Sequence, residues 1–355
     1  MSKRILITGG AGFVGSFLGL GLAQSYPEWK ITALDNLKRR GSELNLPRLK
    51  QAGIEFIHGD VRNIEDLDPV ALQPDLILEC SAEPSVLAGY GSPNYVLQTN
   101  LAGTINCLEL ARKTRADFIF LSTSRVYPIL ALNALKFTET ATRFQLQNQQ
   151  ILPGVSDQGI SEDFPLNGAR SLYGATKLAS ELLIAEYADA YGLRTVVNRC
   201  GVLTGPWQMG KIDQGVFALW MAFHYFGRSL KYIGYGGTGK QVRDFLHVAD
   251  LLDLIELQID MLQELRGQTF NVGGGETNTL SLYETTQICQ EITGHQIPIT
   301  PMSETRAGDV PIFITDARKI MQATGWYPKR NAKTTLTEIY QWIHQFKDLV
   351  GNIFL

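Results

Sequence analysis

The sequence predicts an α/β protein: a doubly wound parallel β-sheet, followed by a smaller and less regular C-terminal domain. Three observations lead to this prediction. Short apolar runs alternate with helical stretches through the first half of the chain, these runs are apolar at nearly every position, and the alternation ends near Cys200. Strands that are apolar on both sides are typical of a parallel sheet covered by helices on both faces. We therefore expect a first domain over residues 1–200 and a second, mainly over residues 201–355.

Six strands are expected in the first domain, because six short apolar runs each end at a turn signal. They are residues 4–9 (RILITG), 30–35 (KITALD), 54–60 (IEFIHGD), 74–80 (PDLILEC), 116–123 (ADFIFLST) and 195–200 (TVVNRC). Helical spacing marks residues 13–26, 94–114 and 173–191. A polar segment at residues 135–167 interrupts the domain, and its composition suits an ordered insertion and a mobile loop equally well.

Composition and charge exclude several classes of partner. A formal net charge of -3 over 355 residues gives no reason to expect nucleic acid or an anionic membrane. No stretch approaches the ~20 apolar residues of a membrane span, and the apolar run in MSKRILITGG is too short for a signal peptide. The four cysteines lie far apart and form no CxxC pair, so we expect buried thiols, no metal site and a cytoplasmic location.

The turn after the first strand carries the pattern G-x-x-G-x-x-G, with Gly9, Gly12 and Gly15 between a strand and a helix. Glycines there let the backbone approach a pyrophosphate, and the N-terminus of the helix presents N–H groups to its negative charge. Asp35 ends the second strand about 20 residues later, where a carboxylate can bind the hydroxyls of an adenosine ribose. Its charge repels a 2′-phosphate, which favours NAD over NADP. The cations at 38–40 could bind such a phosphate, but a run of charge is more often a solvated loop.

A second pattern, YGATK, places Tyr173 and Lys177 four residues apart on one face of a helix. A free tyrosine has a pKa of about 10, which is too high for a base at neutral pH. A lysine one turn away, with a positive nicotinamide ring, would favour the phenolate, and Tyr173 could then take a proton from a sugar hydroxyl as hydride leaves carbon. Ser122, Thr123 and Ser124 end the fifth strand, where their hydroxyls could bond the reacting oxygen or cap a turn.

These motifs, in this order, resemble the extended short-chain dehydrogenase/reductase family, and the resemblance covers nearly the whole chain. It rests on the glycine motif, GDV at 59–61, Ser122-Thr123, the Tyr-x-x-x-Lys pattern and VRDFLHVADL at 242–251. The family implies a Rossmann domain that binds NAD and a small C-terminal domain that binds a nucleotide sugar. It also implies catalysis by Thr123, Tyr173 and Lys177.

The resemblance further implies which residues contact the two ligands. The implied cofactor contacts are Gly9, Gly12, Phe13, Val14, Gly15, Asp35, Asn36, Asp60, Val61, Ser81, Ala82, Asn100, Ser122, Tyr173, Lys177 and Cys200. The implied substrate contacts are Thr123, Arg125, Gln214, Arg243, Arg306 and Asp309. Among these, Asp60 and Val61 would lie near the adenine, and Arg243 would hold the diphosphate of the substrate.

The two residues after Thr123 separate the activities within the family. The 4,6-dehydratases carry Asp-Glu there, which protonates the leaving hydroxyl, and the nucleotide-sugar decarboxylases usually carry Glu at the second position. This chain has Ser124-Arg125, so epimerases and ketoreductases remain. We expect an epimerase with a tightly held NAD. A ketoreductase that exchanges NAD(P)H and a catalytically silent dinucleotide-binding scaffold are the alternatives.

A narrower resemblance is to the CDP-tyvelose (CDP-paratose) 2-epimerases. It rests on DNLKRRGSELNL at 35–46, TETATRF at 138–144 with the insertion after it, DQG at 213–215, GKQVRDFLH at 239–247 and the basic residue Arg125. The chain departs from the wider family at Val202, in SLYG before the catalytic Tyr, and in ECSAEPSV, which lacks the common His. The resemblance implies a CDP- or UDP-linked sugar as substrate and a homodimer or homotetramer.

Overall fold

A computed structural model describes residues 2–210 and 214–354 of the chain. By compactness the chain divides into two units. Unit 1 comprises Met1–Val126, Leu172–Arg199 and Leu251–Phe270, and unit 2 comprises Tyr127–Ser171, Cys200–Asp250 and Asn271–Leu355. The domain boundary expected at residue 200 stays a prediction. The two compact units differ from the expected domains in two segments. Residues 127–171 belong to unit 2, and residues 251–270 belong to unit 1.

Unit 1 is built on a seven-stranded sheet with the strand order β14, β10, β5, β4, β1, β2, β3. Its strands are β1 Arg4–Thr8, β2 Lys30–Asp35, β3 Glu55–His58, β4 Leu76–Glu79, β5 Asp117–Thr123, β10 Thr195–Cys200 and β14 Gln268–Val272. The pairs β1–β2, β2–β3, β1–β4 and β4–β5 are parallel. The predicted fold class is confirmed, and all six expected strands are present.

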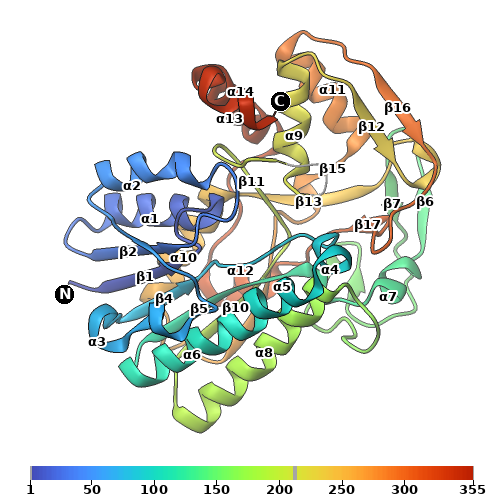
Figure 1. The fold of residues 1–355 in the computed structure, drawn as a ribbon. Coiled ribbons are helices and arrows are strands. Elements are labelled where there is room, and N and C mark those ends of the chain that lie inside the picture. Colours follow the sequence, from blue (N-terminus) through green and yellow to red (C-terminus); the bar gives the residue numbers. More distant parts are fainter. Residues whose placement is uncertain (1, 211–213, 355) are drawn as a thin grey trace. The chain divides into compact units, whose positions relative to one another are not determined.

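Helices cover both faces of this sheet (Figure 1). They are α1 Phe13–Ser25, α2 Leu46–Gln51, α3 Pro69–Leu72, α4 Ala88–Gly91, α5 Pro93–Leu97, α6 Gly103–Thr114, α8 Leu172–Tyr191 and α10 Val248–Asp260. On one face α1 contacts α2, and a Cβ on Gly21 of α1 would stand 2.1 Å from a methyl carbon of Leu252 in α10. On the other face α6 and α8 pack against each other and against β5. Both surfaces of the central strands β4, β5 and β10 are therefore buried, as their uniform apolarity predicts, whereas the edge strand β3 is only partly buried.

The stretch expected as one helix over residues 94–114 is α5, a π-helical turn and α6 in succession. The π turn covers Gln98–Ala102 and contains Asn100, which is fully buried. Turns of this kind inside α-helices are frequent at functional sites. The residue that the family resemblance assigns to the cofactor side thus lies on a distinctive piece of backbone.

Unit 2 begins with the segment expected as an insertion. It forms the short helix α7 Ile129–Asn133 and two antiparallel hairpins. The hairpin strands are β6 Phe137–Glu139, β7 Phe144–Leu146, β8 Val155–Ser156 and β9 Gly159–Ile160. Residues 135–167 thus contain two hairpins, and their expected role as an ordered active-site insertion stays a prediction.

The rest of unit 2 contains a four-stranded sheet, a two-stranded sheet and a group of helices. The strands are β11 Val202–Thr204, β13 Val242–His247, β15 Thr279–Ser281 and β17 Ile312–Phe313 in the larger sheet, and β12 Leu230–Ile233 and β16 Ile299–Met302 in the smaller. The helices are α9 Val216–Tyr225, α11 Leu282–Thr293, α12 Arg318–Thr324, α13 Ala332–Gln345 and α14 Lys347–Phe354. α9 is apolar on most sides, and this suits its position, since α11, α13 and α14 all contact it.

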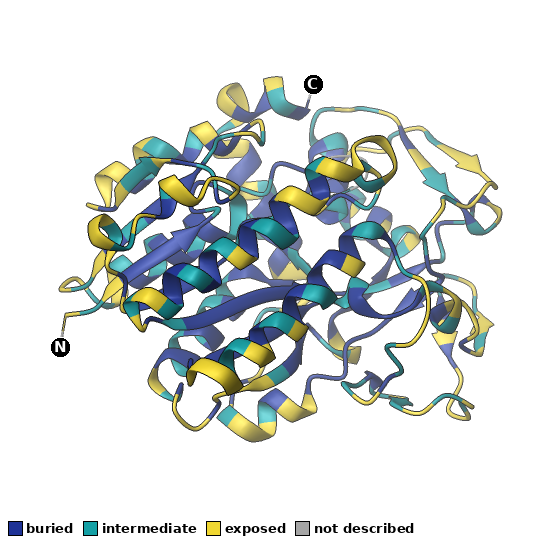
Figure 2. Ribbon diagram, turned by 60° about the horizontal axis from the view of Figure 1, so that its bottom comes forward, coloured by how far each residue is buried: buried dark blue, intermediate teal, exposed yellow. Residues whose placement is uncertain are grey.

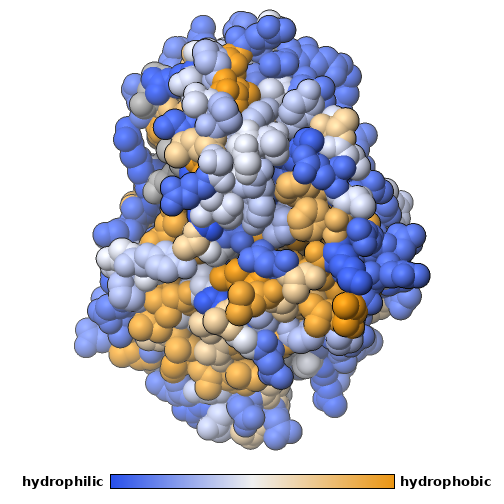
Figure 3. All heavy atoms as spheres, turned by 90° about the vertical axis from the view of Figure 1, so that its right-hand side faces the viewer, coloured by the Kyte–Doolittle hydropathy of each residue, from blue (hydrophilic) through white to orange (hydrophobic). Residues whose placement is uncertain are grey.

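Burial follows the layers of each unit. Figure 2 shows buried residues along the strands and on the inward faces of the helices, and exposed residues on the outward faces. In unit 1 one cluster of buried side chains joins β1, β4 and β5 to α6 and α8. On the face drawn in Figure 3, apolar side chains gather in the lower half of the view, with hydrophilic ones around them. Among the described residues, no helix combines the length and the apolarity that spanning a membrane requires.

Candidate active site

The glycine motif forms the turn between β1 and α1. Gly9 has a φ of +66°, and a Cβ there would stand 2.9 Å from the backbone of Ser81. A Cβ on Gly15 would stand 2.3 Å from the Gly9 carbonyl oxygen, so the turn closes only with glycine at both positions. Gly12 is the N-cap of α1, with no capping side chain and no acidic residue in the first turn. These residues fit a dinucleotide, whose pyrophosphate would meet the N–H groups at the positive end of the helix.

Asp35 ends β2 and ties two loops together. Its carboxylate accepts hydrogen bonds from the backbone N–H of Ala11, at 3.1 Å, and of Leu37, at 2.8 Å. Burial raises the pKa of this carboxyl group, and the backbone N–H bonds oppose the rise. Because Ala11 lies inside the glycine turn, Asp35 also fixes the loop on which the pyrophosphate would rest. The contact of Asp35 with the adenosine ribose stays a prediction.

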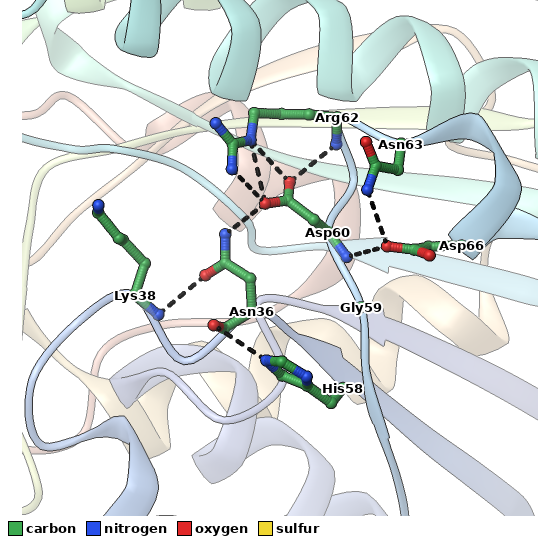
Figure 4. Close-up of a pocket in the computed structure, with 8 residues that line it drawn as sticks. All are labelled: Asn36, Lys38, His58, Gly59, Asp60, Arg62, Asn63 and Asp66. Atoms are coloured by element: carbon green, nitrogen blue, oxygen red, sulfur yellow. Dashed lines mark hydrogen bonds and ion pairs between the residues drawn. The ribbon is translucent and has the colours of Figure 1, made fainter.

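A pocket in unit 1 brings together two predicted cofactor residues, Asn36 and Asp60 (Figure 4). The Asn36 amide donates to Asp60 Oδ2 at 2.9 Å, and Arg62 Nε donates to both oxygens of the same carboxylate, at 2.9 and 3.0 Å. The hydrogen bonds from Arg62 lower the pKa of Asp60 to about 2, so Asp60 remains an anion. Lys38, from the basic run, also lines the pocket, and the Lys38 and Arg62 cations both lie over the Tyr95 ring, at 5.4 and 5.2 Å from its centroid.

Five more predicted cofactor residues of unit 1 open α1 or follow β3 and β4. Phe13 and Val14 open α1, and Val61 is buried against α6. Ser81 follows β4, and its hydroxyl shares a hydrogen bond of 3.1 Å with Thr8 of β1. Ala82 comes next in the chain, before Glu83. Their contacts with NAD stay predictions.

Asn100 connects the loop after β4 to the helix α8. Its Oδ1 accepts from the backbone N–H of Glu83 at 2.7 Å, and its Nδ2 donates to the Glu83 carbonyl at 3.1 Å. The same Nδ2 donates to Thr176 Oγ1 of α8 at 3.3 Å. The π turn therefore presents one side chain that holds both a cofactor-side loop and the helix that carries Tyr173.

The three predicted catalytic residues stand on β5 and α8, which contact each other. Thr123 is the last residue of β5, and Tyr173 and Lys177 lie one helical turn apart on α8. Their exposed fractions are 7%, 8% and 2%. Thr123 Oγ1 accepts from the backbone N–H of Arg125 at 3.2 Å, and Lys177 Nζ lies 4.2 Å from the centroid of the Phe120 ring. The structure brings the three residues to one strand–helix pair, and their catalytic role stays a prediction.

A buried ion pair joins α8 to β10, and the motifs in the sequence did not indicate it. Glu181, one turn beyond Lys177, binds Arg199 at 2.7 Å, and their side chains are 6% and 8% exposed. Ser122, a predicted cofactor residue, donates from its hydroxyl to Glu181 Oε1 at 2.5 Å. The sequence places Glu181 on the same helix face as Lys177, four residues later, but this spacing is common and does not indicate Arg199 as a partner.

Five predicted ligand residues lie in unit 2, and the structure brings three of them together. Arg243 donates to Asp309 Oδ1 at 2.7 Å, and the backbone N–H of Asp309 donates to the Arg306 carbonyl at 3.2 Å. The cation expected to hold the diphosphate is therefore already paired with a carboxylate. Cys200 ends β10 and is buried, and Gln214 precedes α9. Ligand binding by all five stays a prediction.

The fold, the glycine turn and the Tyr–Lys helix together define a class of dinucleotide-dependent enzyme. Residues 5–273 match the NAD dependent epimerase/dehydratase family. The chain belongs to this family, and its cofactor is NAD. The resemblance to the extended short-chain dehydrogenase/reductases is thereby confirmed at the level of a nucleotide-sugar epimerase or dehydratase.

Individual relatives span almost the full chain. The CDP-paratose 2-epimerase of Salmonella typhi is 32% identical over 348 residues, which cover 96% of this chain and 98% of that protein. A dTDP-glucose 4,6-dehydratase of Salmonella typhimurium is 25% identical over an alignment that covers 99% of this chain and 95% of that protein. The structure of Thermus thermophilus UDP-glucose 4-epimerase in complex with NAD superposes with a TM-score of 0.76, at 26% identity over 96% of this chain and 99% of that one.

Proposed function

We propose that this protein is a nucleotide-sugar epimerase that inverts C2 of a CDP-paratose-like sugar. The similarity to CDP-paratose 2-epimerase over nearly the whole chain supports this reaction. The observation that carries the choice against dehydration is Ser124-Arg125, which follows Thr123 directly. A guanidinium stays protonated at any working pH and cannot serve as the acid that protonates a leaving hydroxyl.

NAD, held by the turn of Gly9, Gly12 and Gly15, would supply a reversible hydride acceptor. Tyr173, as the phenolate, takes the proton of the C2 hydroxyl while C2 loses hydride and becomes a ketone. Thr123 orients the reacting oxygen, and the Lys177 ammonium favours the phenolate by its opposite charge. The ketone then turns over in the site, C2 regains hydride on its other face, and the oxygen takes its proton back from Tyr173. No net oxidation results.

The turning of the ketone needs a fixed point, which we place at the diphosphate. The proposed anchor is Arg243, together with Arg306, which lies three residues before Asp309, the present partner of Arg243. A diphosphate carries more negative charge than the single carboxylate of Asp309, so it would compete for the guanidinium that Asp309 now holds at 2.7 Å. The expected homodimer or homotetramer and the CDP or UDP base remain predictions.

The first test is mass spectrometry of the nucleotide released when the purified protein is denatured, with no cofactor added. Stoichiometric NAD supports a cofactor that is recycled in place, as epimerisation requires. An empty protein or one that holds NADP would instead support the alternative, an NAD(P)H-dependent nucleotide-sugar ketoreductase. A CDP- or UDP-sugar found beside NAD would identify the substrate class.

The second test is conversion of CDP-paratose in D2O, followed by proton NMR. We expect the C2 epimer, CDP-tyvelose, without deuterium at C2, because the hydride returns from the cofactor rather than from solvent. Tyr173→Phe is the matched control and should slow the conversion by roughly 10²–10⁴-fold. Deuterium at C2 would refute hydride return. Loss of water from dTDP-glucose without C2 inversion would identify a dehydratase, and NAD binding without any turnover would identify a scaffold.

A further inference from the structure

One buried carboxyl group in unit 1 is not used by the proposed reaction. Glu79 ends β4, and its side chain is fully buried. Its Oε1 accepts from Thr104 Oγ1 of α6 at 2.7 Å, and its Oε2 has no hydrogen-bond partner among the residues that the structure describes. An ionised carboxylate in such a place is costly unless a positive charge lies nearby. Glu79 therefore calls for a neighbouring cation.

The geometry of the sheet places Lys177 beside it. Glu79 of β4 and Phe120 of β5 are register partners on parallel strands, so their side chains leave the sheet on the same face. The Lys177 ammonium lies over the ring of that Phe120, 4.2 Å from its centroid, and Lys177 is only 2% exposed. A buried ammonium is stabilised in part by an aromatic ring, but it keeps its proton best when an anion is near. Each of the two buried groups, the Glu79 carboxylate and the Lys177 ammonium, is stabilised by the opposite charge of the other.

The other groups that face Glu79 leave Lys177 as the cation that acts on it. In the described part of the chain, Thr104 and Cys107 face it from α6, Lys177 faces it from α8, and Thr8 is its register partner on β1. Cys107 stays a neutral thiol, because burial and the nearby Glu79 carboxylate raise its pKa. Burial raises the pKa of Glu79 to about 7, while the Lys177 charge and the Thr104 hydrogen bond act in the opposite direction. Glu79 thus changes its charge near neutral pH.

We propose that Glu79 is the buried counter-charge of Lys177, a positioning residue that keeps Lys177 protonated one helical turn from Tyr173. While Glu79 is an anion, the ammonium persists and favours the Tyr173 phenolate. When Glu79 takes up a proton, Lys177 loses its counter-charge and the phenolate loses its support. The existence of the ion pair is independent of the reaction, whereas its catalytic effect rests on the proposed function.

The ion pair is tested without any assay of turnover, by a double-mutant cycle of urea unfolding in saturating NAD. Glu79→Gln removes the anion of the proposed pair, Lys177→Met removes its cation, and the double variant removes both. Near pH 8, where Glu79 is ionised, we expect the effects on the unfolding equilibrium constant to be non-additive by about tenfold. At about pH 5.5 Glu79 is protonated, and the non-additivity should shrink. Additive effects at both pH values would overturn the proposal.

Asp117→Asn provides the matched control for this cycle. It is the same change from carboxylate to amide, but Asp117 opens β5 at the other end of the sheet and pairs with Arg194 at 2.6 Å. Its combination with Lys177→Met should be additive. A non-additivity equal to that of Glu79→Gln would show that the coupling is unspecific, and it would overturn the assignment to Glu79.

The catalytic effect is tested by the pH profile of kcat/KM. Thr104→Val changes none of Glu79, Lys177 and Tyr173, and it removes the hydroxyl whose hydrogen bond lowers the pKa of Glu79, together with the 2.8 Å bond from that hydroxyl to the Asn100 carbonyl. The acid limb of the profile should therefore move to higher pH, by on the order of one pH unit. Glu79→Gln should lower kcat about tenfold with little change in KM, and its pH profile should lack the acid limb. Glu79→Asp keeps the charge, so its profile should retain the acid limb.

The outcomes of these experiments separate the two proposals. An acid limb that is the same in the wild type, Thr104→Val and Glu79→Gln would overturn the catalytic role of Glu79. A wild-type protein that converts no nucleotide sugar would refute the proposed function. In that case the unfolding cycle would still decide whether Glu79 and Lys177 form a pair.

Discussion

The free energy of unfolding should fall by about 3 kcal/mol when Glu181 is replaced by Gln. The magnitude follows from the surroundings of this side chain. Arg199 and Glu181 are less than a tenth exposed, and Arg199 donates to Glu181 Oε2 from Nε at 3.0 Å and from a terminal nitrogen at 2.7 Å. Gln keeps the shape and can still accept from Ser122, but it leaves the guanidinium buried without its anion. Breaking such a pair costs about 3–5 kcal/mol, and we take the lower end because the amide oxygen remains.

Urea unfolding, followed by circular dichroism, measures this loss. Glu291→Gln is the matched control, since Glu291 pairs with Lys333 at 2.6 Å but both side chains are well exposed, at 61% and 65%. It should cost less than about 1 kcal/mol. Replacing both partners, with Glu181→Leu and Arg199→Met, should recover part of the loss because no buried charge is left alone. A loss for Glu181→Gln no larger than that of the exposed control would refute the reasoning.

Three further predictions concern the site and the stability of each unit. Tyr173→Phe should lower turnover by roughly 10²–10⁴-fold while the released NAD stays stoichiometric, because the variant loses a positioned proton acceptor and keeps the cofactor fold; near wild-type turnover would contradict this role. Gly15→Ala should release NAD on purification, as measured by mass spectrometry, because its Cβ would stand 2.3 Å from the Gly9 carbonyl oxygen. Burial lowers the pKa of His247 to about 4, below that of the unfolded chain, so its contribution to stability is present above about pH 6.5 and is lost as the pH falls toward 4. His247→Gln should flatten that decline in the urea midpoint, and an unchanged decline would argue against it.

Local sequence patterns were sufficient for the elements that depend on contiguous residues. The glycine turn, the strands and the Tyr-x-x-x-Lys spacing each lie within one short stretch, and each is found where it was expected. The π turn at Gln98–Ala102 could not be predicted in this way. Its residues have ordinary helical spacing, and the extra residue is accommodated because Asn100 binds Glu83 and Thr176, which lie far away in sequence.

The charged groups of the site were beyond sequence reasoning for a related reason. Glu79 stands at the end of an apolar run that reads as a buried strand, and nothing local shows whether its charge has a partner. Glu181 of α8 and Arg199 of β10 meet only in the folded unit, because α8 packs on β5, the neighbour of β10 in the sheet. The pairing of Arg243 with Asp309 likewise joins two segments that lie 66 residues apart in the chain. Tertiary contacts determine which residue pairs with a buried charge, and these contacts cannot be read from a single sequence.

The edge strand β14 has a consequence for how the protein is made. It pairs with β10 in the sheet, yet β10 ends at Cys200 and β14 begins at Gln268. A ribosome that adds about 5–20 residues per second needs roughly 3 to 13 seconds to synthesise the chain between them. During that interval the outer backbone of β10 offers unpaired N–H and C=O groups, which can template pairing with a neighbouring nascent chain. The sheet of the NAD-binding unit therefore cannot be completed during synthesis until much of the second unit has been translated, and throughout that delay the β10 edge is open to pairing with another chain.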